Sequence, residues 1–117
     1  MLLSFLLSIL SSFGFAGIEN YKSDFTVYFD TGNAFDVSIR GDSLMWKGMA
    51  GEDKGTEQTV KIKHVSLAKN VEVFQWKEKR GYFVTFVVDT LNKKAITSTK
   101  NDKNQDWLVE GKITYLK

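Results

Sequence analysis

The sequence contains no cysteine and no proline, and its 117 residues include a single histidine, His64. Without cysteine the chain has no disulfide, no thiolate metal site and no thiol nucleophile. One histidine also excludes a zinc site built from several histidines. We therefore expect no metal and no cofactor, and we expect the hydrophobic core alone to hold the domain together.

Charge is absent from residues 1–16, where an apolar stretch is broken only by serines. This stretch is too short to span a bilayer as a free helix. The triplet Gly14-Phe15-Ala16 has the small-x-small pattern of a signal-peptide cleavage site. The pattern predicts a signal peptide over residues 1–16, although no Lys or Arg precedes the apolar stretch. The alternative is a short buried or frayed N-terminal helix.

Cleavage after Ala16 would leave residues 17–117 as one secreted or periplasmic domain with a net charge of +2. The 16 basic and 14 acidic residues are mixed along this part, so no strong field attracts nucleic acid or an anionic membrane. Nucleic-acid binding would also need basic residues between exposed aromatics, and the basic run 93–103 contains no aromatic residue. We expect neither a nucleic-acid partner nor stable membrane insertion after cleavage.

Polar and apolar residues alternate with a period of two along most of the remaining chain, as when Phe25, Val27 and Phe29 flank Thr26 and Tyr28. The pattern predicts eight strands with short joints: 24–30, 34–40, 43–48, 59–65, 71–78, 82–89, 94–100 and 107–116. Such a meander loses both open edges by closing on itself. We therefore predict an all-β fold, an eight-stranded antiparallel up-and-down barrel with room for side chains or one small ligand.

The stretch WKGMAGEDKG, residues 46–55, places three glycines and four charged residues between two predicted strands. A phosphate-binding loop would need Gly-x4-Gly-Lys-Ser/Thr before a helix, and the spacing here differs. A calcium loop would need alternating oxygen ligands, whereas Glu52 and Asp53 are adjacent. The pattern favours a flexible glycine-rich connection at one end of the barrel.

Two runs carry a family resemblance: VYFDTGNAFDVSIRGDSLMWKGMAGEDKG from residue 27, and VEVFQWKEKRGYFVTFVVDTLNKKAITSTK from residue 71. Their shared features are an aromatic first strand ending in an acid-x-Gly turn, a Gly-Met-x-Gly loop, a Trp-x-Glu and a later strand ending in Asp. In order and spacing the chain resembles the MoaF-like domains, which are calycin-type proteins, over about residues 24–100. It is more distantly similar to bacterial phenolic acid decarboxylases. The resemblance implies a small lipocalin-like barrel with a central pocket.

The resemblance to the decarboxylases implies a substrate clamp made of two first-strand tyrosines and a loop arginine, assisted by the glutamate of Trp-x-Glu. Glu78 matches that glutamate. The tyrosine positions fall on Val27 and Phe29, which cannot donate a hydrogen bond. The arginine position falls at or beside Glu52, which has the opposite charge. The clamp is missing, so decarboxylation of that kind is not expected.

The phase of the strands adds further candidates. His64 shares a face of its predicted strand with Val60 and Ile62. Trp76 and Glu78 share one face of a later predicted strand. The alternatives are an ordinary interior histidine and a solvent-facing strand-end glutamate. The complete set of candidate ligand-binding residues is Val27, Phe29, Trp46, Glu52, His64, Trp76 and Glu78.

The sequence therefore favours an exported barrel that binds a small apolar or aromatic molecule without catalysis, and we assign no catalytic residue. One alternative is an enzyme of the decarboxylase-like type with Glu78 and His64 as acid and base. A second alternative is a barrel with a filled interior that acts as an interaction module. An enzyme should converge several polar groups on its pocket, and the sequence offers two.

Overall fold

The computed structural model describes residues 20–115, which fold into nine strands and no helix. The predicted signal peptide over residues 1–16 lies outside the described residues. In the described range no helix is long and apolar enough to cross a membrane. The strands are β1 (Lys22–Phe29), β2 (Ala34–Arg40), β3 (Ser43–Ala50), β4 (Glu57–Lys61), β5 (Lys63–Ala68), β6 (Val71–Lys77), β7 (Phe83–Asp89), β8 (Lys94–Lys100) and β9 (Asp106–Tyr115).

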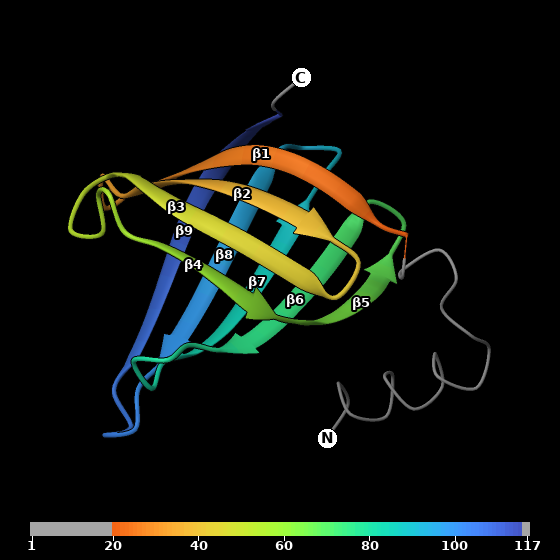
Figure 1. The fold of residues 1–117 in the computed structure, drawn as a ribbon. Coiled ribbons are helices and arrows are strands. Elements are labelled where there is room, and N and C mark those ends of the chain that lie inside the picture. The colour runs from red at the N-terminus through yellow and green to blue at the C-terminus, as the bar shows by residue number, and fades with distance from the viewer. Residues whose placement is uncertain (1–19, 116–117) are drawn as a thin grey trace.

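All nine strands belong to one sheet with the order β4-β3-β2-β1-β9-β8-β7-β6-β5. Figure 1 shows the sheet curving into a nearly closed barrel. The first strand pairs with the last, because β1 and β9 form an antiparallel ladder from Phe25 opposite Tyr115 to Phe29 opposite Gly111. This pairing confirms the predicted all-β antiparallel barrel.

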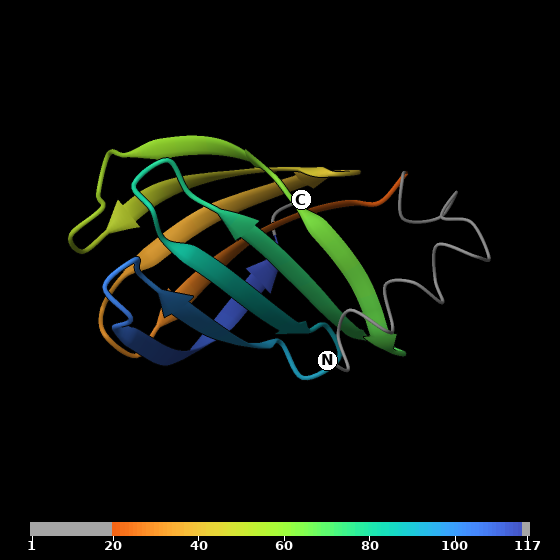
Figure 2. The ribbon, with the colours of Figure 1, turned by 90° about the horizontal axis from the view of Figure 1, so that it is seen from below.

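The predicted number of eight strands is wrong, because the strand expected at 59–65 is divided at Ile62 into β4 and β5. β4 pairs with β3, whereas β5 pairs with β6. At the break the Ile62 N–H donates to the Asp42 carbonyl at 2.7 Å. Figure 2 shows β4 and β5 following one another as a single bent path that closes the sheet. Among the described residues no ladder joins β4 to β6, and we call this junction the seam.

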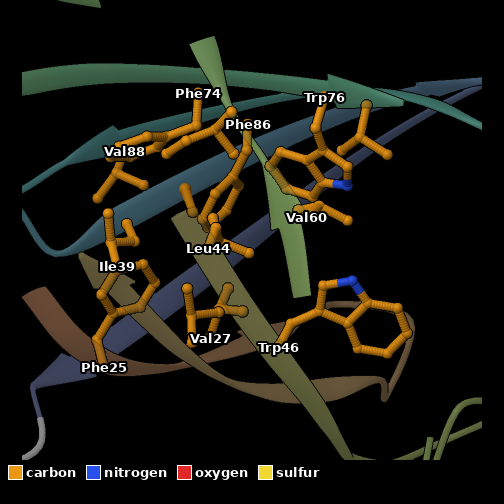
Figure 3. Close-up of a cluster of buried hydrophobic side chains, with 14 of the residues drawn as sticks. Phe25, Val27, Ile39, Leu44, Trp46, Val60, Phe74, Trp76, Phe86 and Val88 are labelled. Carbon is orange, nitrogen blue, oxygen red and sulfur yellow. The ribbon is translucent and has the colours of Figure 1, made fainter. Parts of the chain in front are cut away.

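The hydrophobic core fills one end of the barrel. We call it the closed end; it carries the connections 41–42, 69–70 and 90–93. Phe74 and Phe86 meet here with ring centroids 6.2 Å apart, and Phe25 lies 6.0 Å from Phe86. Figure 3 shows this cluster with the rings of Trp46 and Trp76 to one side of it. The largest fully buried side chains are Phe25, Phe74, Ile39, Leu44, Val27 and Val88.

The opposite end, which we call the open end, carries the connections 30–33, 51–56, 78–82 and 101–105. Trp107 lies here at the start of β9 and is 45% exposed. Its ring faces Tyr82 at a centroid distance of 6.2 Å. It keeps the inward strand phase at the rim of the open end.

Candidate functional site

A cavity of about 720 Å³ occupies the open end of the barrel. Its volume lies within the range of small-molecule pockets, roughly 300–1,000 Å³. Aromatic rings from both sides of the seam contribute to its wall, among them those of Phe29, Phe35, Trp46, Trp76, Tyr82 and Trp107. The hydrophobic cluster of the closed end forms the floor. The interior is therefore filled at one end and hollow at the other.

Among the described residues, Arg80, in the turn between β6 and β7, is the basic residue that lines the cavity. Its guanidinium donates to Glu78 Oε1 and to Asp53 Oδ1, each at 3.0 Å. The same group lies 5.8 Å from the ring centre of Trp46 and 5.3 Å from that of Tyr82. A planar guanidinium suits both kinds of contact. Arg80 thus joins the β3–β4 loop to the β6–β7 turn across the seam.

The rim of the cavity has an excess of negative charge. In the described range 20–115, the charged residues of its lining are Glu52, Asp53, Glu78 and Arg80, with a formal charge of −2 at neutral pH. Burial lowers the pKa of Arg80, but the hydrogen bonds to Asp53 and Glu78 outweigh burial and raise that pKa above its usual value. The guanidinium is therefore permanently charged and already matched by two carboxylates.

The loop after β3 is held by backbone hydrogen bonds, and its predicted flexibility stays a prediction. Gly48 N–H donates to the Thr56 carbonyl at 2.8 Å, and Gly55 N–H donates to the Gly48 carbonyl at 2.9 Å. A Cβ at Gly48 would lie 1.8 Å from the Asp53 carbonyl oxygen, which only glycine permits. The tight loop brings Asp53 over the cavity, where its carboxylate reaches Arg80.

Six of the seven candidate residues line the cavity together, and their role in binding stays a prediction. They are Val27, Phe29, Trp46, Glu52, Trp76 and Glu78. Glu78 is buried and forms an ion pair with Arg80. The alternative of a solvent-facing glutamate is therefore wrong. Val27 and Phe29 add apolar surface only.

His64 is the candidate that the structure places elsewhere. It points inward, but it is packed at the closed end, with its ring 4.6 Å from Tyr21 and 4.5 Å from Phe74. Its Nε2 contacts Glu72 Oε1 at 2.5 Å, and the Ser66 hydroxyl donates to the same oxygen at 2.6 Å. Burial raises the pKa of Glu72, but the hydrogen bonds with His64 and Ser66 lower that pKa by more than burial raises it. The pKa of Glu72 therefore lies below its usual value.

The proposed acid–base pair of Glu78 and His64 is not brought together. His64 lies opposite Phe74 in the β5–β6 ladder. Glu78 follows Phe74 by four residues, which at 3.3 Å per residue is about 13 Å further along the strand. His64 belongs to a buried polar cluster at the closed end, as expected for an interior histidine.

Sequence reasoning missed Arg80, Asp53 and Tyr82 as residues of the site. Arg80 occurs in the stretch Lys79–Gly81, which reads as an ordinary charged turn. A usable signal existed, because alternate connections of an up-and-down barrel gather at the same end. The β3–β4 loop and the β6–β7 turn are both such connections, and their opposite charges could have been paired.

Fold and site together define an antiparallel β-barrel that is filled at one end and has an aromatic-lined cavity at the other. The model of the MoaF-like family matches residues 21–114, so the chain belongs to the MoaF-like family. The predicted resemblance to that family is confirmed, and the more distant one to phenolic acid decarboxylases stays a prediction.

One solved structure extends the comparison of folds. The chain is similar to a provisionally named beta-lactamase from Burkholderia vietnamiensis, with a TM-score of 0.75 and 16% identity. The match covers 80% of this chain and 92% of that chain. At this identity the likeness shows a shared fold only. A comparison with curated proteins gives no match.

Proposed function

We propose that the barrel binds a small apolar or aromatic molecule in its open-end cavity and catalyses no reaction on it. The observation that carries this proposal is the cavity of about 720 Å³ with an aromatic wall and a hydrophobic floor. Ligand pockets combine such walls with a few placed polar groups. The charged groups here lie at the rim, where they border the entrance.

The catalytic alternative has less support from the geometry. A general acid or base must lie within hydrogen-bond reach of the substrate proton. Glu78 borders the cavity but is engaged by Arg80, and His64 is engaged by Glu72 at the closed end. The alternative of a filled barrel has less support because of the volume of the cavity.

Filling the cavity should abolish binding, and a pair of double variants tests this. Thr97 and Val109 face each other on β8 and β9 and line the cavity, whereas the neighbouring pair Ser98 and Leu108 faces outward. We expect Thr97→Trp/Val109→Trp to weaken binding of N-phenyl-1-naphthylamine by tenfold or more, about 1.4 kcal/mol. Ser98→Trp/Leu108→Trp should bind as the wild type does.

The measurement is probe fluorescence together with quenching of tryptophan emission, and thermal melting confirms that each variant is folded. A wild-type protein that does not bind the probe would contradict the proposal. Equal affinity in the inward and outward variants would place the probe outside the barrel.

We further propose that residues 1–16 direct export and that the barrel acts in the periplasm or outside the cell. The support is the charge-free apolar stretch and the triplet Gly14-Phe15-Ala16. N-terminal sequencing of the protein purified from its own cells should begin at or near Gly17. A soluble cytoplasmic pool that still begins with Met1 would overturn the proposal.

A further inference from the structure

Glu78 brings a buried carboxylate to the cavity. It follows β6 in the turn to β7, it lines the cavity, and its side chain is only 9% exposed. Its Oε1 accepts a hydrogen bond from Arg80 at 3.0 Å. Among residues 20–115 no hydrogen bond to Oε2 is formed, and this atom is not one of the fully enclosed side-chain oxygens. Glu78 therefore keeps one carboxylate oxygen that a ligand in the cavity can reach.

The turn fixes the position of this carboxylate. Glu78 N–H donates to the Tyr82 carbonyl at 2.8 Å, and Gly81 N–H donates to the Glu78 carbonyl at 2.9 Å. These two bonds hold the main chain of residues 78–82, and Arg80 holds the Glu78 side chain from within the same turn. The free oxygen thus belongs to a group whose place is set before a ligand arrives.

The charge around this oxygen favours a positive ligand. In the described range, three carboxylates and one guanidinium line the cavity and leave a formal charge of −2. Asp53 and Glu78 already match the guanidinium of Arg80. Glu52 is exposed, and none of the ion pairs among residues 20–115 involves it. A cationic ligand would reduce the excess of negative charge, whereas an anionic ligand would increase it.

Arg80 itself shows how this end of the barrel accommodates a positive group. Its guanidinium lies 5.8 Å from the ring centre of Trp46 and 5.3 Å from that of Tyr82, while it donates to two carboxylates. The face of an aromatic ring attracts a cation electrostatically. Trp107 lies edge-on to Tyr82 and is 45% exposed, so further aromatic surface is accessible at the rim. Carboxylates beside aromatic rings suit an organic ammonium group.

We propose that the ligand is a protonated aromatic amine, whose ammonium group donates a hydrogen bond to Glu78 Oε2 and whose ring lies in the cavity. This inference rests on the proposed binding function and names the class of its ligand. The ammonium group stays at the rim, so its charge is not moved into the apolar floor. The ring packs on the aromatic wall. An aromatic carboxylate is disfavoured, because it would meet Glu78 Oε2 and Glu52 with the same sign of charge.

Three probes of similar shape separate charge from apolar contact. 2-Naphthylmethylamine is protonated at neutral pH, 2-naphthylmethanol has the same ring with an uncharged hydroxyl, and 2-naphthoate has a negative charge. In calorimetric titrations of the folded protein at low salt, the amine should bind about tenfold tighter than the alcohol. The naphthoate should bind more weakly than the alcohol.

A substitution assigns the preference to Glu78. Glu78→Gln keeps the size of the side chain and an acceptor for Arg80, but removes the negative charge. It should reduce the preference for amine over alcohol from about tenfold to about twofold and leave the affinity for the alcohol within about twofold. Glu57→Gln removes the same charge from an exposed residue of β4 outside the cavity, and should leave the preference unchanged. Thermal melting shows whether both variants are folded.

The outcomes distinguish this inference from the function on which it rests. If none of the three probes binds, both are overturned. If amine and alcohol bind equally, or if naphthoate binds tightest, the barrel is a binding protein and the ligand class is wrong. A preference for the amine that survives Glu78→Gln would reject the assignment to Glu78. If that variant does not fold, nuclear Overhauser effects between the CH₂ of the amine and the Glu78 side chain of the wild type decide, and their absence rejects the assignment.

Discussion

Phe74→Ala is expected to lower the free energy of unfolding by about 3–5 kcal/mol, and Trp76→Ala by about 2–3 kcal/mol. Both residues lie on the inner face of β6, two positions apart. Phe74 is 0% exposed and contacts the rings of Phe86 and His64, so its removal opens a new void in the filled end. Trp76 borders the existing cavity, and its removal mainly enlarges that space. Trp76→Ala should therefore lower the free energy of unfolding less than Phe74→Ala, although tryptophan is the larger side chain.

Urea denaturation of the two variants measures this difference, with Phe83→Ala as the control. Phe83 is an exposed residue of β7, and its removal should change the stability by about 0.5 kcal/mol or less. Equal losses at Phe74 and Trp76 would contradict the division into a filled and a hollow end. A loss below about 1 kcal/mol at Phe74 would mean that the strand has the opposite register.

Gly48→Ala is expected to destabilise the domain by about 2–3 kcal/mol, at the upper end of the cost of overpacking. The added Cβ would lie 1.8 Å from the Asp53 carbonyl oxygen and 2.4 Å from its carbon, which are backbone atoms. The loop must therefore move as a unit, and Asp53 moves with it. We expect the ion pair between Asp53 and Arg80 to break.

Gly55→Ala is the matched comparison in the same loop. Gly55 has a φ of +86°, and a Cβ there would meet nothing within 4 Å. The substitution adds backbone strain of about 1–2 kcal/mol without a collision. Chemical denaturation gives both stabilities, and the side-chain Nε–H resonance of Arg80 reports on the ion pair. A Gly48→Ala protein that is as stable as wild type and keeps that resonance would contradict the loop structure.

The strands were predictable because alternation of polar and apolar residues also decides which side chains enter the core. Phe25, Val27 and Phe74 show this, since each is buried as its strand phase indicates. The bend at Ile62 was not predictable. Val60, Ile62 and His64 are all buried, so the alternation continues through the break and leaves no local mark of it.

The site was less predictable than the strands, for a physical reason. The candidates along β1, β3 and β6 followed from strand phase, but Arg80 depends on a contact with Asp53, 27 residues earlier. Such a pair exists only once the sheet has curved round and brought two connections together. Whether a barrel has a cavity likewise depends on how side chains from several strands pack together. No single stretch of the sequence indicates that packing.

The seam is the part of the wall where no backbone ladder among the described residues resists widening. Elsewhere around the sheet, hydrogen-bonded ladders hold neighbouring strands about 4.8 Å apart, so widening would break backbone hydrogen bonds. Between β4 and β6 no ladder among the described residues has to be broken. The ion pair of Asp53 with Arg80 connects the two sides of the seam. Loosening one exposed ion pair changes the free energy by about 0–1 kcal/mol. Widening the barrel at the seam would therefore cost less free energy than widening it between strands joined by a ladder.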